Sequence, residues 1–157
     1  MKEMESETKQ KTNDELVSVI QRILAEDQMD GHSRAPACLA ELVSLEKDFV
    51  GTDCEDMYWD SVSREHLHIG QRAGQRGDAE QALSSIKLAL EAARKVKADF
   101  YRGSDWLAYL DATVAYFESA PERLRALSSQ CSLNRAVVER LMRGLRERGA
   151  PDYQKDY

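Results

Sequence analysis

The spacing of apolar residues constrains this fold more than any other feature of the sequence. Apolar side chains recur three and four positions apart along most of the chain, as in Ala82, Ile86, Ala89 and Ala93. This spacing places side chains on one face of an α-helix, whereas a strand requires alternation with a period of two. No alternating stretch of convincing length occurs, so the sequence predicts an all-α protein.

Capping residues divide this pattern into about seven helices. A hydroxyl, amide or carboxylate side chain followed three residues later by Glu or Gln can satisfy the free N–H groups at a helix start. Such boxes begin at Thr12, Thr52, Asp78 and Ser119, and Pro36 and Ser132 mark two further starts. We predict a single domain of antiparallel hairpins over residues 12–149, with a disordered N-terminal segment over 1–11 and a flexible C-terminal tail over 150–157.

Composition and charge indicate a soluble protein. Hydrophobic residues make up 42% of the chain and charged residues 32%, with only 3 prolines, which suits a helical globular domain. The net charge of −6 disfavours indiscriminate binding to nucleic acid or to an anionic membrane. No stretch approaches the ~20 apolar residues of a membrane span. We expect a cytoplasmic protein without membrane association.

The cysteines and the titratable residues give no catalytic pattern. Cys38, Cys54 and Cys131 are odd in number and far apart, which predicts reduced, partly buried thiols instead of disulfides or a zinc site. Cys54 lies near a predicted helix start, where the helix dipole can lower the pKa of a thiol. No pairing of a nucleophile with a base is visible, so we predict neither an enzyme nor a cofactor.

Two histidines separated by a single residue, His66 and His68, precede three glycines. Residues two apart on a helix point in nearly opposite directions, so these two side chains cannot readily share a metal ion. Gly70, Gly74 and Gly77 match no phosphate-loop spacing and follow a helical pattern instead of a strand. We therefore predict no metal site, and interpret His66 as a side chain at the core edge and His68 as a surface side chain.

The glycines instead predict a tight helical hairpin. A glycine inside a helix costs about 1 kcal/mol relative to alanine, and close approach of a neighbouring helix would compensate at Gly70. Gly77 and Asp78 supply the turn, and Ala82 and Ala89 place small residues on the facing helix. Two closely packed antiparallel helices follow.

This hairpin resembles the tetratricopeptide repeat, whose pattern is aromatic-x-x-Leu-Gly-x-x-aromatic, a turn, and then Ala-x-x-x-Phe. The matching places are His66, Ile69-Gly70, Ala73, Gly77-Asp78, Ala82, Ile86 and Ala89-Leu90. His66 and Ala73 stand where the family has aromatic residues. The resemblance covers residues 63–96 and implies a right-handed α–α superhelix of three helix pairs, capped by the helix that begins near Ser132.

Proteins that resemble this family usually bind a peptide or partner protein in a groove lined by the first helix of each pair. The resemblance therefore implies a non-catalytic interaction module or scaffold. The expected contact residues are Arg64, His68, Gln71 and Gln75 within 53–76, and Tyr101, Asp105, Tyr109 and Tyr116 within 99–118. Guanidinium and tyrosine groups suit an extended peptide with an acidic side chain or C-terminal carboxylate. The alternative is that these are solvated or packing residues.

Two further partners remain open from the sequence. Aromatic residues expected to be exposed, such as Tyr58, make a homodimer a candidate. Residues 122–145 resemble a helix-turn-helix in which Asn134, Arg135 and Arg140 would approach DNA, which is an alternative function. Glutamates interrupt this basic face, and a capping helix with a solvated surface explains the same segment.

Overall fold

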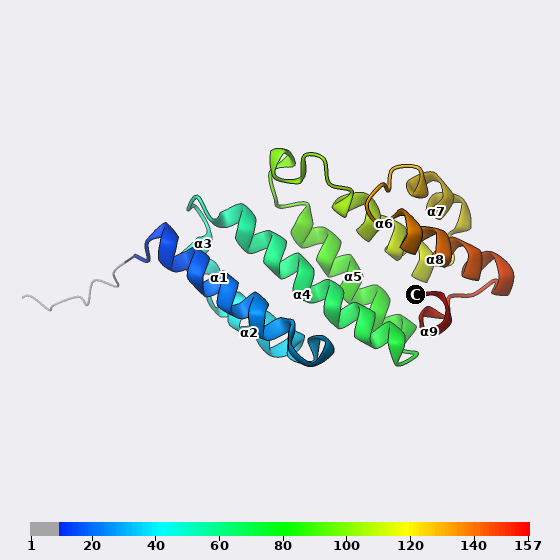
Figure 1. Cartoon of the computed structure of the whole chain (residues 1–157), viewed down its shortest axis with the longest axis horizontal. Helices are drawn as coiled ribbons and strands as arrows, with labels where there is room; N and C mark the ends of the chain where they lie inside the picture. Colours follow the sequence, from blue (N-terminus) through cyan, green and yellow to red (C-terminus); the bar gives the residue numbers. More distant parts are fainter. Residues whose placement is uncertain (1–9) are drawn as a thin grey trace, which may run out of the picture.

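The computed structural model describes residues 10–157, which form helices and turns without a strand (Figure 1). The helices are α1 (Asn13–Asp27), α2 (Ala35–Ser44), α3 (Glu46–Phe49), α4 (Glu55–Gln75), α5 (Ala79–Ala93), α6 (Trp106–Phe117), α7 (Pro121–Ser128), α8 (Arg135–Arg148) and α9 (Tyr153–Asp156), with 3-10 turns η1 (Met29–His32) and η2 (Ala98–Tyr101). The all-α prediction is confirmed. Most of the predicted disordered segment, residues 1–9, lies outside the described residues.

Six of these helices begin within three residues of the predicted starts, and α6 lies within the predicted range 99–118. The predicted side-chain cap forms at two of the starts. The Thr12 hydroxyl accepts a hydrogen bond from the Glu15 N–H at the start of α1. The Asp78 carboxylate does the same for the Gln81 N–H at the start of α5. The two additional helices in the described part of the chain, α3 and α9, have four residues each, which is too short for an apolar period to reveal.

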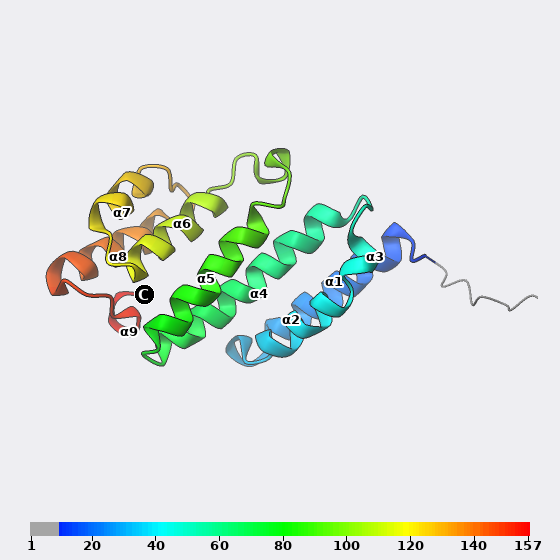
Figure 2. The ribbon, with the colours of Figure 1, turned by 180° about the vertical axis from the view of Figure 1, so that it is seen from behind.

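Helices α4 and α5 form the predicted hairpin and lie side by side in the middle of the molecule (Figures 1 and 2). A Cβ atom at Gly70 would lie 2.7 Å from Cγ1 of Ile86 and 3.1 Å from the carbonyl oxygen of Ala82. The facing backbone therefore approaches α4 more closely than any side chain would permit. Gly77 ends the hairpin turn with a φ of +84°, a conformation that glycine adopts without a steric cost.

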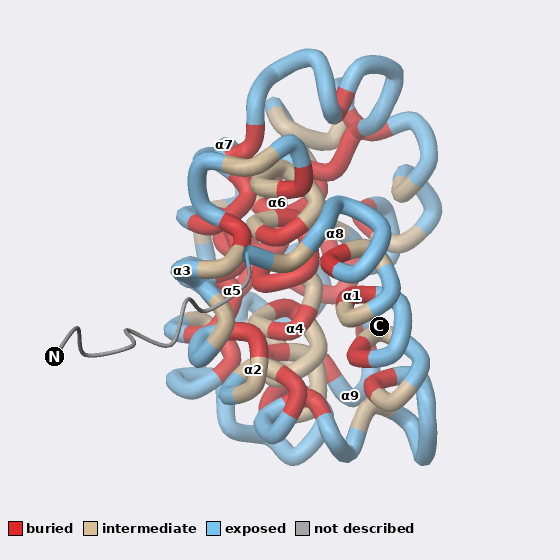
Figure 3. The backbone as a smooth tube through the Cα atoms, turned by 90° about the vertical axis from the view of Figure 1, so that its left-hand side faces the viewer, coloured by how far each residue is buried: buried red, intermediate tan, exposed pale blue. Residues whose placement is uncertain are grey.

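Two hydrophobic clusters meet at α4. The first fills the space between α1, α2, α3 and α4, and includes Leu16, Ile20, Leu42, Phe49 and Tyr58. The second extends from α4 to α9 and includes Ile86, Leu110, Tyr116, Leu124 and Leu141. Trp59 packs against both clusters. Figure 3 shows the buried segments gathered along the interior. Helix α4 therefore holds side chains that face both halves of the fold.

The prediction of a flexible tail over 150–157 is wrong, because α9 is packed into the second cluster. Tyr153 is 3% exposed and Asp156 is 6% exposed. Two glycines make the room: a Cβ atom at Gly74 would lie 2.9 Å from the Tyr153 ring, and one at Gly144 would overlap the Asp156 carboxylate. Asp152 caps α9 by accepting a hydrogen bond from the Lys155 N–H.

Tyr58 was expected at the surface but is buried. Tyr58 is 1% exposed, and its hydroxyl donates to the carbonyl of Leu42 at 2.9 Å, so the argument for a homodimer from exposed aromatics fails at this residue. All three cysteines are buried free thiols, as predicted. Within residues 10–157, none of the helices has both the length and the apolar character needed to cross a membrane.

Candidate functional site

The four predicted contact residues of 99–118 do not form an exposed surface. Tyr101, Asp105, Tyr109 and Tyr116 are all buried, so the expectation that they line an open groove is wrong. The physical reason is that each polar group has an internal partner, which removes the cost of burying it. The Tyr101 hydroxyl, for example, donates to Asp60 Oδ1 at 2.8 Å.

Asp105 is hydrogen-bonded to Asn134, one of the three residues expected to approach DNA. Its carboxylate accepts hydrogen bonds from the backbone N–H of Asn134 at 2.8 Å and from the Asn134 side-chain amide at 2.7 Å. Arg135 donates through Nε to the carbonyl of Cys131. Two of the three side chains expected to approach DNA are therefore engaged within the chain, whereas Arg140 is exposed.

The predicted residues of α4 have three different environments. Arg64 donates to Asp60 Oδ2 at 2.9 Å and lies 4.6 Å above the Trp106 ring. Gln75 is exposed. Gln71 lies with its amide nitrogen 3.3 Å from the Tyr109 hydroxyl and 3.4 Å from the Tyr157 hydroxyl. Gln71 therefore contacts Tyr109, another predicted residue, whereas Arg64 and Gln75 lie outside this group of contacts.

The contact set around Gln71 holds the C-terminal segment of the chain. Tyr116 donates its hydroxyl proton to Asp156 Oδ2 at 2.5 Å and accepts a hydrogen bond from the Asp152 N–H at 2.7 Å. Arg148 forms an ion pair with the same Asp156 carboxylate. We call this surface the C-terminal seat; it consists of Gln71, Gly74, Tyr109, Tyr116, Gly144 and Arg148. Three of the eight predicted contact residues belong to it.

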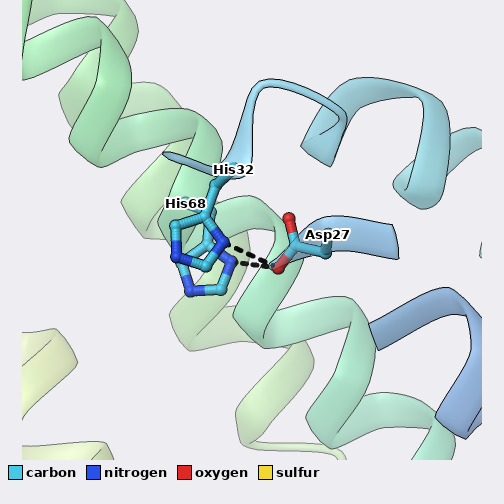
Figure 4. Close-up of side chains that lie close together, drawn as sticks. All are labelled: Asp27, His32 and His68. Carbon is cyan, nitrogen blue, oxygen red and sulfur yellow. Dashed lines mark hydrogen bonds and ion pairs between the residues drawn. The ribbon is translucent and has the colours of Figure 1, made fainter. Parts of the chain in front are cut away.

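A second cluster joins the end of α1 to the middle of α4 (Figure 4). Asp27 is 1% exposed, and its Oδ2 atom lies 3.1 Å from Nδ1 of His32 and 2.6 Å from Nδ1 of His68. The two imidazole rings are stacked, with centroids 3.7 Å apart and an angle of 22° between them. We call Asp27, His32, His68 and the neighbouring Glu65 the Asp27 cluster.

The backbone of η1 brings His32 back towards α4. Asp30, Gly31 and His32 all have positive φ values, of 52°, 58° and 64°, so the chain reverses in the left-handed region directly after α1. Arg72 of α4 donates to the carbonyl of Gly31 at 2.7 Å and fixes this turn against α4. His32 remains partly exposed, with 37% of its side chain accessible.

Glu65 lies in α4, one turn before His68, and is fully buried. Among the described residues, neither of its carboxyl oxygens has a hydrogen-bond partner, and Asp27 Oδ1 has none either. Burial raises the pKa of Glu65 to about 9, and the adjacent Asp27 carboxylate adds to this effect. The raised pKa of Glu65 favours its protonated form at neutral pH, and its carboxyl group lies beside that of Asp27.

The surroundings of His68 favour a neutral imidazole. Burial lowers its pKa, and this outweighs the opposing effect of Asp27. A neutral imidazole retains a nitrogen lone pair, which can bind a proton or a metal ion. The prediction that His68 is a surface side chain is wrong, because only 20% of the side chain is accessible. His66 lies outside this group of possible ligand residues.

Comparison of the chain with protein-family models, curated proteins and solved structures finds no match.

Proposed function

We propose that this chain is a non-catalytic protein-interaction module, built as a tetratricopeptide-like stack of helical hairpins, whose C-terminal seat binds a partner segment carrying an aromatic and an acidic side chain. The observation that supports this proposal is that residues 152–157 of the chain occupy the seat through side-chain contacts. A partner displaces α9 and makes the same contacts. The acidic side chain agrees with the peptide expected from the arginine and tyrosine residues, whereas the segment is helical and not extended.

The seat offers one position for a ring and one for a carboxylate. Gly74 leaves space for an aromatic ring, which in this chain is Tyr153 at ring distances of 5.3 Å from Phe117 and 6.2 Å from Tyr116. Arg148 and the Tyr116 hydroxyl supply a charge-assisted contact for the carboxylate. Such contacts are stronger than neutral hydrogen bonds. The residues that fill these two positions, Tyr153 and Asp156, are three apart in a helical turn. The seat therefore selects a helical segment of the form aromatic-x-x-acid.

The covalently attached segment competes with any partner. A tethered ligand acts at an effective concentration on the order of millimolar, so a partner of modest affinity binds only when α9 is weakened. We therefore test the proposal with a variant of the full chain in which Tyr153→Ala and Asp156→Ala release α9. A fluorescent peptide with the sequence of residues 150–157 serves as the partner.

We expect the peptide to bind the released variant at least about tenfold more tightly than the unaltered chain. A control peptide in which alanine replaces the same Tyr and Asp should bind neither protein. Circular dichroism must first show that the variant retains its helices. If the folded variant binds both peptides equally, or neither, the proposal is wrong. If the chain alone forms dimers that the variant does not form, exchange of α9 between copies is the preferred explanation of the seat.

A further inference from the structure

We propose that Asp27, His32 and His68 form a binding site for one divalent transition-metal ion, with Zn²⁺ as the ion that best suits the donor set. One ligand atom from each of the three side chains lies within 4.8 Å of the other two. Imidazole nitrogens with a carboxylate oxygen are a typical zinc ligand set. The site lies on α1, η1 and α4, apart from the C-terminal seat, so this inference does not depend on the proposed function.

The distances between the donor atoms suit an ion once the two imidazole rings, which are stacked at an angle of 22°, rotate so that both nitrogens point towards it. Zinc bonds of about 2.0–2.1 Å in tetrahedral geometry place ligand atoms roughly 3.3 Å apart. In the structure, Asp27 Oδ2 lies 3.1 Å from one imidazole nitrogen and 2.6 Å from the other. In that state each imidazole donates a proton to the same oxygen. An ion between the three atoms takes the place of these two protons, and each imidazole stays neutral because its proton moves to Nε2.

The buried carboxyl groups supply an independent observation. Glu65 is fully buried, and among the described residues its two oxygens and Asp27 Oδ1 have no hydrogen-bond partner. Buried polar atoms without a partner are rare, because nothing compensates the loss of their hydration. A divalent ion bound to Asp27 supplies positive charge where two acidic side chains adjoin.

We assign Glu65 as a positioning residue behind Asp27, not as a ligand. The three possible ligands group without it, whereas its carboxyl group adjoins that of Asp27. Ligating carboxylates are themselves commonly oriented by a hydrogen-bonding neighbour. Three protein ligands leave the fourth tetrahedral position for water or another small ligand.

The neighbouring cations do not block the site. Arg64 is paired with Asp60, and Arg72 donates to the carbonyl of Gly31. The partly exposed ring of His32 leaves this side of the cluster open to solvent. An ion can therefore enter from the η1 side without opening the hydrophobic cluster between α1 and α4.

The test is titration of the full chain, first stripped of metal with a chelator, with zinc chloride in a calorimeter. Cobalt(II) in a parallel titration gives a visible absorption band that reports the coordination geometry. We expect one ion per chain. His32→Ala removes a ligand from a partly exposed turn, so it leaves the fold intact and should weaken the affinity more than about 100-fold. Residues that only support a ligand typically contribute 10–100-fold, which is the range expected for Glu65→Gln.

His66→Ala is the matched control, because it removes a histidine from the same helix but outside the cluster. Its zinc affinity should stay within about twofold of the unaltered chain, since no ligand is lost. The proposal is overturned if the unaltered chain takes up no zinc, or if His32→Ala binds zinc as tightly as the unaltered chain. Equal weakening by His66→Ala and His32→Ala would also overturn it, because binding would then not depend on this cluster.

Discussion

Asp27 and His68 lie 41 residues apart in the chain and are joined by a 2.6 Å hydrogen bond between Oδ2 and Nδ1. The first residue ends α1 and the second is in the middle of α4. Their contact fixes how far α1 extends along α4. It is a directional polar contact between two helices that otherwise pack through apolar side chains such as Ile20 and Val62.

Replacing His68 should therefore destabilise the fold. His68→Ala removes one donor from a buried carboxylate, and losing such a partner costs about 1–3 kcal/mol. Urea denaturation in the presence of a chelator measures the free energy of unfolding without a contribution from metal. His66→Ala should cost less than about 1 kcal/mol, because His66 is not bound to Asp27. An equal loss in the two variants would show that the bond to Asp27 adds little.

The pH dependence of stability should report Glu65. Its folded pKa is raised to about 9, above the usual value of about 4.3 for an unfolded chain, so between these values the folded state binds more protons than the unfolded state. The free energy of unfolding must then fall as the pH rises. The slope cannot exceed about 1.4 kcal/mol per pH unit for one proton.

The Glu65→Gln variant isolates this effect. A glutamine does not titrate, so the metal-free variant should lose less stability than the unaltered chain between about pH 7 and pH 9. The window lies above the pKa values of His66 and His68, which are lowered by burial and act in the opposite direction at more acidic pH. Chemical denaturation at a series of pH values measures both slopes. Identical slopes would mean that Glu65 is ionised in the folded protein.

The sequence predicted the features that depend on neighbours along the chain. Thr12 and Asp78 cap helices as their local patterns indicate, and Gly70 marks the close contact between α4 and α5. Ser119 was expected to cap a helix but has a φ of +55° and ends α6 instead. Its hydroxyl is compatible with both roles, and only the packing of α7 against α6 decides between them.

The Asp27 cluster could not be found in this way. In the sequence, the histidine nearest to His68 is His66, and helical geometry excludes an ion shared by this pair. The actual neighbours of His68 come from the end of α1 and from a left-handed turn, and no periodic signal specifies how those elements lie on α4. The prediction that tyrosines of α6 line a groove was wrong for a different reason. A tyrosine has an apolar ring and a polar hydroxyl, so it suits an exposed surface as well as a core in which the hydroxyl has a hydrogen-bond partner.

Gly70→Ala should destabilise the protein, although the same change stabilises most exposed helix interiors by about 1 kcal/mol. The added Cβ would meet Cγ1 of Ile86 at 2.7 Å and the Ala82 carbonyl oxygen at 3.1 Å, so α4 and α5 must separate. A loss of about 1–3 kcal/mol is expected for such overpacking. Thermal denaturation followed by circular dichroism measures it. A higher Tm would contradict this prediction, because it would show that the hairpin has room for a Cβ atom at position 70.

Tyr116→Phe should loosen the C-terminal segment while preserving the ring that fills the core. The change removes the hydroxyl that donates to Asp156 and accepts from the Asp152 N–H, leaving Arg148 as the partner of a buried carboxylate. Loss of these bonds should cost about 1–3 kcal/mol. Hydrogen exchange should also accelerate at residues 152–157 more than in α1, because the lost contacts are local.

Tyr157→Phe is the control for this comparison. Tyr157 is 44% exposed, and its hydroxyl contacts only Gln71 among the described side chains, so removing it should change the free energy of unfolding by less than about 0.5 kcal/mol. If Tyr116→Phe left exchange in α9 unchanged, the packing of Tyr153 against Gly74 would hold the segment without the Asp156 contact. A partner would then have to compete mainly for the aromatic position of the seat, and the acidic residue would contribute little to recognition.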